Sequence, residues 1–91
     1  MTTLPTIHLN GTGADTLCSE YKTVRLALIT ARKALEDATL NARDFYVQGG
    51  NTYAAARAER TAMLRKLDEL CAYAAAWEGA ALDAIEAKQK R

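Results

Sequence analysis

Two long stretches of the chain repeat apolar residues at alternating steps of four and three, and this spacing constrains the fold more than any other feature. In the first stretch the repeat comprises Leu17, Tyr21, Val24, Leu28, Ala31, Leu35 and Ala38. In the second it comprises Arg60, Met63, Leu67, Leu70, Ala74, Trp77, Ala81 and Ala84. Residues at this spacing lie along one side of an α-helix. The pattern therefore predicts two long amphipathic helices that pack through these sides.

Glycines and capping residues indicate where these helices begin and end. Thr12-Gly13-Ala14-Asp15 has the spacing of a capping box, and Gly49-Gly50 interrupts the chain before a long stretch without proline. We therefore predict an all-α protein with two long helices in an antiparallel hairpin. The expected parts are an extended N-terminal arm over 1–12 and a helical hairpin over 13–91, with a helix at about 13–41, a loop at about 42–51 and a helix at about 52–89.

The apolar content of the chain is too small for two long helices to bury much surface alone. Hydrophobic residues make up 49% of its 91 residues, but 19 of them are alanines, each of which buries little area. We therefore expect a homodimer in which two hairpins form a four-helix bundle. Such a dimer would cover an overhang of the second helix near 77–85, and in an antiparallel dimer the arm of one copy could reach the loop of the other.

Charge and hydropathy exclude two kinds of partner. The chain carries 12 basic and 11 acidic side chains, for a formal net charge of +1, whereas a general nucleic-acid binder would show a basic excess. No apolar run approaches the length of a membrane span, and the first residues lack the charged and apolar regions of a signal peptide. We therefore expect a cytoplasmic protein that binds neither membranes nor nucleic acids in general.

Two cysteines, Cys18 and Cys71, lie far apart in the sequence. They form neither a CxxC motif nor a His/Cys spacing suited to zinc, so no metal site is expected. In a reducing compartment such cysteines behave as small buried hydrophobic residues. A disulfide across the hairpin is the alternative, and the sequence leaves it open.

The residue patterns that enzymes use are not recognisable in this chain. His8 is its one histidine, and no serine or cysteine lies in a nucleophile motif. Gly11-Thr12-Gly13 lacks the spacing of a phosphate-binding loop. The acidic pairs Glu36-Asp37 and Asp68-Glu69 are neighbours in the sequence, so they diverge around a helix. We therefore predict a protein without catalytic residues and without a cofactor.

Polar side chains suited to specific binding are concentrated in the connecting loop. Arg43, Asp44, Tyr46 and Gln48 place a guanidinium, a carboxylate, a phenol and an amide within a few residues of one another. Such a group can bind a phosphate, a base or the backbone of a partner. A structural role is the alternative, in which Asp44 pairs with Arg43 or caps the turn while Phe45 and Tyr46 close the end of the bundle.

Three further residues are candidates for ligand or partner binding. His8 and Asn10 alternate with Ile7 and Leu9, so they would share one face of the arm. Arg60 occupies a position of the second apolar repeat, where a charged side chain needs a reason. It would pair with a carboxylate of the neighbouring helix and set the register, or it would face an anionic ligand.

Two segments of the chain resemble a group of short proteins encoded by phages and prophages of proteobacteria. The segments are Pro5-Thr6-Ile7-His8-Leu9-Asn10-Gly11-Thr12 and Asn41-Ala42-Arg43-Asp44-Phe45-Tyr46-Val47-Gln48-Gly49. The resemblance covers most of the chain but is specific in these two segments alone. It implies a phage accessory protein that works in the host cytoplasm, and it supplies neither a reaction nor a ligand.

Small helical phage proteins suggest three functions for this chain by analogy. The first is a non-enzymatic factor that binds and inhibits a host protein, such as a component of a CRISPR defence system. The second is a small-molecule binder that sequesters a nucleotide immune signal, and the third is a virion assembly protein. The second function would use a composite site made of His8, Asn10, Arg43, Tyr46 and Gln48.

Overall fold

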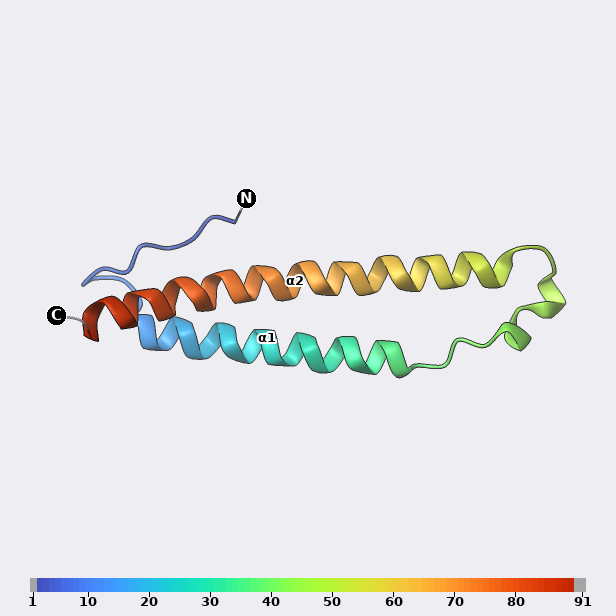
Figure 1. Cartoon of the computed structure of the whole chain (residues 1–91), viewed down its shortest axis with the longest axis horizontal. Coiled ribbons are helices and arrows are strands. Elements are labelled where there is room, and N and C mark those ends of the chain that lie inside the picture. Colours follow the sequence, from blue (N-terminus) through green and yellow to red (C-terminus); the bar gives the residue numbers. More distant parts are fainter. Residues whose placement is uncertain (1, 90–91) are drawn as a thin grey trace.

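The chain forms a long hairpin of two antiparallel helices, as shown by a computed structural model that describes residues 2–89 (Figure 1). Helix α1 spans Ala14–Asp37 and helix α2 spans Thr52–Gln89. Two short 3-10 turns, η1 (Ala42–Asp44) and η2 (Tyr46–Gln48), lie in the connection. The molecule measures 66 × 23 × 21 Å. The predicted all-α hairpin with an extended N-terminal arm is thereby confirmed.

Helix α1 ends earlier than the sequence suggested, at Asp37 rather than near residue 41. Ala38 follows it in an extended conformation, with φ −64° and ψ 138°. A few residues later, the Asn41 side chain accepts a hydrogen bond from the Arg43 backbone N–H at 3.1 Å and thereby starts η1. Asparagine side chains compete with helical hydrogen bonding in this way, so the chain turns before another helical turn can form.

The start of α1 also differs from the predicted capping box. The N-cap residue is Gly13, whose extended backbone carries no side chain that could accept from the first helical N–H groups. Thr12 lies one position too early for that role. Asp15 remains in the first turn, where a negative charge interacts favourably with the helix dipole.

The loop break that Gly49-Gly50 predicts is confirmed. Both glycines have positive φ values, 70° and 60°, which other residues rarely adopt. After them the Thr52 hydroxyl donates to the carbonyl oxygens of Gly49 at 3.2 Å and Phe45 at 3.4 Å. These hydrogen bonds hold the connection against the first turn of α2.

The side of each helix that faces the other differs in part from the predicted apolar repeat. On α1 the less exposed stripe comprises Ala14, Leu17, Cys18, Tyr21, Arg25, Leu28, Arg32 and Leu35. On α2 it comprises Tyr53, Ala56, Arg60, Leu64, Leu67, Cys71, Ala74, Trp77, Glu78, Ala81, Ala84 and Ile85, and it widens around 76–80. The prediction was right at Leu17, Tyr21, Leu28 and Leu35 of α1 and at most of its positions on α2, Trp77 and Ala84 included. It was wrong by one residue at Val24, Ala31, Met63 and Leu70, which are exposed. Val24, Met63 and Leu70 are consequently 44%, 44% and 50% exposed.

Two ion pairs between the helices account for this shift. Arg25 Nε lies 2.6 Å from Glu78 Oε1, and Arg32 Nε lies 2.6 Å from Asp68 Oδ1. The aliphatic stem of an arginine covers apolar surface while its guanidinium reaches a carboxylate. An apolar repeat counts such residues as surface, so it assigned Val24 rather than Arg25 to the interface.

The contact between the helices is narrow. Ala74 and Ala81, at 0% and 1% exposure, are the fully buried hydrophobic residues among those the structure describes, and no large side chain there is fully buried. Leu28 and Leu67, at the centre of the predicted repeats, are half-buried as expected. Alanine lets the two backbones approach closely but removes little area from water, so a single hairpin has a small core for its length.

Helix α2 is longer than α1, with 38 against 24 residues, and most of its extra turns lie at its N-terminal end (Figure 1). There, 52–59 extends past α1 alongside the connecting segment (Figure 1). The expectation of an overhang near 77–85 was wrong, because the Tyr21 and Trp77 rings stack at 4.7 Å and Ala81 is buried. The early end of α1 leaves the loop end of α2 without a helical neighbour (Figure 1).

Candidate interaction surface

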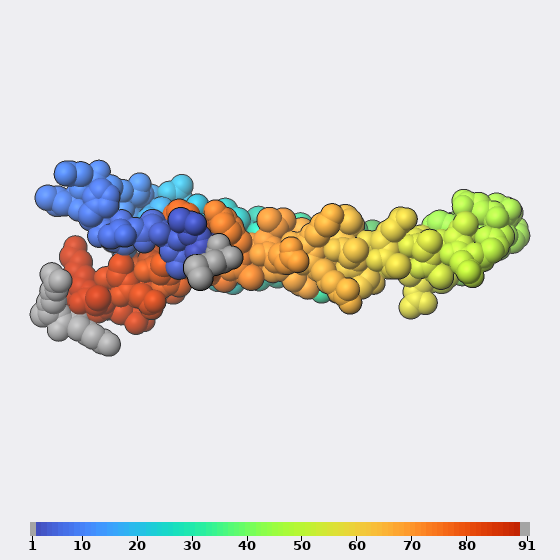
Figure 2. Space-filling view, turned by 90° about the horizontal axis from the view of Figure 1, so that it is seen from above, coloured from blue at the N-terminus to red at the C-terminus, as the bar shows by residue number. Residues whose placement is uncertain are grey.

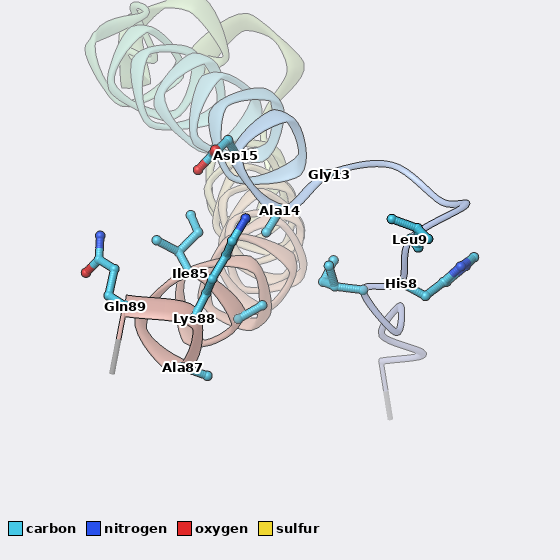
Figure 3. A pocket seen from close by; sticks show the side chains of 11 residues that line it. His8, Leu9, Gly13, Ala14, Asp15, Ile85, Ala87, Lys88 and Gln89 are labelled. Atoms are coloured by element: carbon cyan, nitrogen blue, oxygen red, sulfur yellow. The ribbon is translucent and has the colours of Figure 1, made fainter. Parts of the chain in front are cut away.

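The N-terminal arm lies beside the C-terminal turns of α2, at the end of the molecule opposite the connecting loop (Figures 1 and 2). An open hollow between them is lined by Ile7, Ala14, Ile85 and Lys88, among others. The His8 side chain points away from α2 (Figure 3), and both His8 and Asn10 are exposed. The arm therefore presents its two candidate residues to solvent.

The four candidate residues of the loop, Arg43, Asp44, Tyr46 and Gln48, are all exposed. The structural alternative for this loop is correct in part. Phe45 packs near Tyr53, with ring centroids 6.0 Å apart, whereas Tyr46 is 74% exposed and does not close the end of the hairpin. The side chain that caps the turn is that of Asn41, not of Asp44.

The arm and the loop lie at opposite ends of a molecule 66 Å long (Figure 1). A single chain therefore does not bring His8 and Asn10 together with Arg43, Tyr46 and Gln48. The composite ligand site envisaged for these residues does not form within one copy.

Arg60 bonds across the hairpin, but its partners are backbone oxygens. Its Nη2 donates to the Ala38 carbonyl at 2.6 Å, and its Nη1 donates to the Glu36 carbonyl at 3.4 Å. A cation at this place satisfies carbonyls that the end of α1 leaves free and interacts favourably with the helix dipole. The predicted pairing with the neighbouring helix is thus correct, and the predicted carboxylate partner is not.

The ion pairs between α1 and α2 were not predicted from the sequence. Arg25 and Arg32 are one heptad apart, which was the available signal. Arg32 also pairs with Glu36 on its own helix. The side chains of Arg25 and Glu78 are 29% and 12% exposed, and Arg25 donates to both oxygens of Glu78 at 2.6 and 3.3 Å. These hydrogen bonds lower the pKa of Glu78 below its usual value.

Acid should weaken the hairpin through Glu78. A carboxylate whose pKa is lowered by folding stabilises the folded state above the ordinary glutamate pKa of about 4.3, and that stabilisation is lost as the pH falls through the lowered value. We expect the urea midpoint of the wild-type chain to fall more between about pH 7 and about pH 3 than that of Glu78→Gln, as followed by circular dichroism. Equal falls would show that Glu78 is not involved.

One side of the hairpin, here called the uncharged flank, is apolar and exposed. Its exposed residues are Val24, Ala27, Ala31 and Ala34 of α1, Ala38 just after α1, and Met63, Lys66, Leu70 and Tyr73 of α2, with Lys66 as its one charged residue. The half-buried Trp77 of α2 continues it at the next heptad position. Val24 of α1 comes one residue before Arg25, and Leu70 of α2 comes one residue before Cys71; Arg25 and Cys71 both lie in the contact between the helices. Because the helices run in opposite directions with the same hand, this offset falls on the same side of the hairpin in both.

The opposite side, here called the charged flank, mixes apolar and ionic residues. Its exposed apolar side chains are Leu26, Ile29 and Leu82, at 47%, 48% and 42% exposure. The ion pairs of Arg25 and Arg32 with α2 lie toward this side. The two flanks therefore differ in chemistry although both expose large apolar groups.

The chain shows no signs of metal binding or membrane insertion in the residues described. Cys18 and Cys71 are free and half-buried, so the disulfide alternative is not formed. Residues 2–89 contain no cluster of histidine, cysteine and acidic residues suited to a metal ion. Neither α1 nor α2 has a stretch long and apolar enough to cross a membrane.

Comparisons of the chain with models of known protein families, with curated proteins and with solved structures find no match.

Proposed function

We propose that this chain is a non-enzymatic phage accessory protein that forms a homodimer and inhibits a host protein by covering part of its surface. Binding to another protein is supported by the large apolar side chains that are exposed along both helices, among them Ile29, Leu70 and Tyr73. Exposed apolar surface of this kind is typical of protein interaction sites. The phage context and the host target are inferred from the resemblance of the arm and loop segments.

The charged flank is the better candidate for the host protein. Its apolar side chains, Leu26, Ile29 and Leu82, are exposed next to charged residues such as Lys22 and Asp68. An apolar centre with a polar rim is the usual composition of an interface between proteins that also exist apart. The nucleotide-binding alternative is not favoured, because one chain keeps its proposed ligand residues at opposite ends.

The test is capture of a host protein followed by direct binding. The tagged chain, Ile29→Asp and the matched control Thr30→Asp would be used as baits in bacterial lysate, and the captured protein would be purified for calorimetry. We expect one protein to bind the wild type and Thr30→Asp, with at least about tenfold weaker binding to Ile29→Asp. The proposal would be rejected if the chain captured the same proteins as an unrelated helical bait. It would also be rejected if the captured protein bound Ile29→Asp and Thr30→Asp equally well.

A further inference from the structure

On the uncharged flank, α1 carries mostly small side chains and α2 carries mostly large ones. On α1, a single valine is followed by alanines at positions 27, 31 and 34, and by Ala38 just after the helix. On α2, the corresponding positions hold Met63, Leu70, Tyr73 and Trp77, with Lys66 as the single charge. The flank is thus a shallow channel of small residues along α1 beside a ridge of large residues along α2.

We infer that the uncharged flank is the contact surface between two copies of this chain, with α2 of each copy lying along α1 of the other. A second copy turned by a two-fold axis along the hairpin places its ridge over the channel of the first, and its own channel under the first copy's ridge. Large side chains then meet small ones in both halves of the contact. Every helix also has antiparallel neighbours, which the helix dipoles favour.

The positions of these residues along the long axis of the hairpin agree with this packing of large side chains on small ones. The Arg32–Asp68 and Arg25–Glu78 pairs set Ala31 of α1 beside Leu70 of α2, and Val24 beside Trp77. A two-fold axis along the molecule keeps these levels, so Leu70 of one copy would lie over Ala31 of the other. A second copy of the chain supplies both the large residues that cover α1 of the first copy and the small residues that receive its α2. An unrelated partner would need to reproduce both surfaces.

The available area is close to what a specific dimer needs. Along α1 the flank runs from Val24 to Ala38, roughly 21 Å at 1.5 Å per residue, and the molecule is 21–23 Å across. Their product is roughly 460 Å² per copy, or roughly 900 Å² for two copies, near the area of about 1,000 Å² expected of a specific interface between proteins. A dimer would also cover Val24, Met63 and Leu70, which a single hairpin leaves about half exposed.

An antiparallel pairing of hairpins fits less well. It would place α1 on α1 and α2 on α2, so that the large residues Met63, Leu70 and Tyr73 would meet one another while alanines faced alanines. Only that arrangement would bring the arm of one copy toward the loop of the other. The size pattern of the uncharged flank therefore favours hairpins that point in the same direction.

The first test measures the oligomeric state of the full chain by sedimentation equilibrium. We expect a dimer at micromolar concentration for the wild type and for Glu69→Lys, whose exposed side chain lies away from the flank. Leu70→Lys and Ala31→Lys should each weaken dimerisation at least about tenfold while retaining helical circular dichroism, because both positions are exposed in the single hairpin. A monomeric wild type, or unchanged dimers of both lysine variants, would overturn the inference.

The second test measures the direction of the two hairpins. With Cys18 and Cys71 replaced by alanine, a spin label at Gln48→Cys would report the distance between the two loops. We expect it within about the width of a four-helix bundle, roughly 20–30 Å, whereas antiparallel hairpins centred on Ala31 would give about 50 Å. The longer distance would overturn the proposed direction.

This inference rests on the homodimer of the proposed function but not on the host target. Ile29→Asp changes the other flank, so we expect it to remain a dimer. A dimeric chain that captures no host protein would therefore reject the host target and leave the contact surface standing, while a monomer that binds a host protein would do the reverse.

Discussion

Replacing Ala74 with leucine should lower the free energy of unfolding by about 2–3 kcal/mol, the usual cost of forcing a larger side chain into a tight contact. Ala74 has 0% exposure and lies on α2 between the two ion pairs that join this helix to α1. The added atoms cannot turn toward solvent without separating the helices. The neighbouring ion pairs, Arg25–Glu78 and Arg32–Asp68, would be stretched by such a separation.

The matched control for this substitution is Ala75→Leu. Ala75 is the next residue of the same helix and is exposed, so the same side chain should change the stability there by less than about 0.5 kcal/mol. Urea unfolding followed by circular dichroism, at one protein concentration for all chains because dimerisation contributes to stability, gives both values. If the two variants were equally stable, the helices would not be in contact at Ala74.

The two helices and their antiparallel arrangement could be predicted because that information is local. The repeats through Leu28 and Leu67 extend over many turns, and Gly49-Gly50 supplies a backbone conformation that ends the connection. The early end of α1 could not be predicted from apolar spacing. It depends on Asn41 accepting from the Arg43 backbone and on Arg60 bonding to the carbonyl of Ala38.

The register of the interface was predictable only in part, because apolar residues fill two adjacent stripes on each helix. Tyr21, Leu28 and Leu35 belong to the stripe that packs, and it is completed by Arg25 and Arg32 rather than by Val24 and Ala31. Sequence spacing cannot weigh an arginine that reaches a carboxylate on another helix. The excess stripe that contains Val24 and Ala31 is part of the uncharged flank.

The candidate site residues show the same limit. The sequence placed polar groups such as His8 and Arg43 in the arm and the loop, and both segments are exposed as a binding segment would need to be. Whether such groups act together depends on distances between segments far apart in the chain. The hairpin holds the arm and the loop at opposite ends, so one copy cannot combine them.

Removing the indole ring of Trp77 should be the other strongly destabilising change, with Trp77→Ala lowering the free energy of unfolding by about 2–3 kcal/mol. The ring stacks on Tyr21 at 4.7 Å and lies 6.4 Å from the ring of Tyr73. The Trp77 ring therefore holds the first turns of α1 against α2. Truncation leaves a gap beside Tyr21 and removes one of the largest apolar surfaces from the contact.

Trp77→Phe separates the ring from its polar group. The indole Nε1–H of Trp77 is buried without an acceptor in the part of the chain that the structure describes, and an unsatisfied buried donor costs about 1–3 kcal/mol. Phenylalanine retains an aromatic face for Tyr21 and carries no such donor, so this variant should stay within about 1 kcal/mol of the wild type. Circular dichroism rather than tryptophan fluorescence must follow the unfolding of both variants. A loss for Trp77→Phe as large as that for Trp77→Ala would mean that the N–H is satisfied, by water or by a second copy, and that the stack on Tyr21 is not the source of the stability.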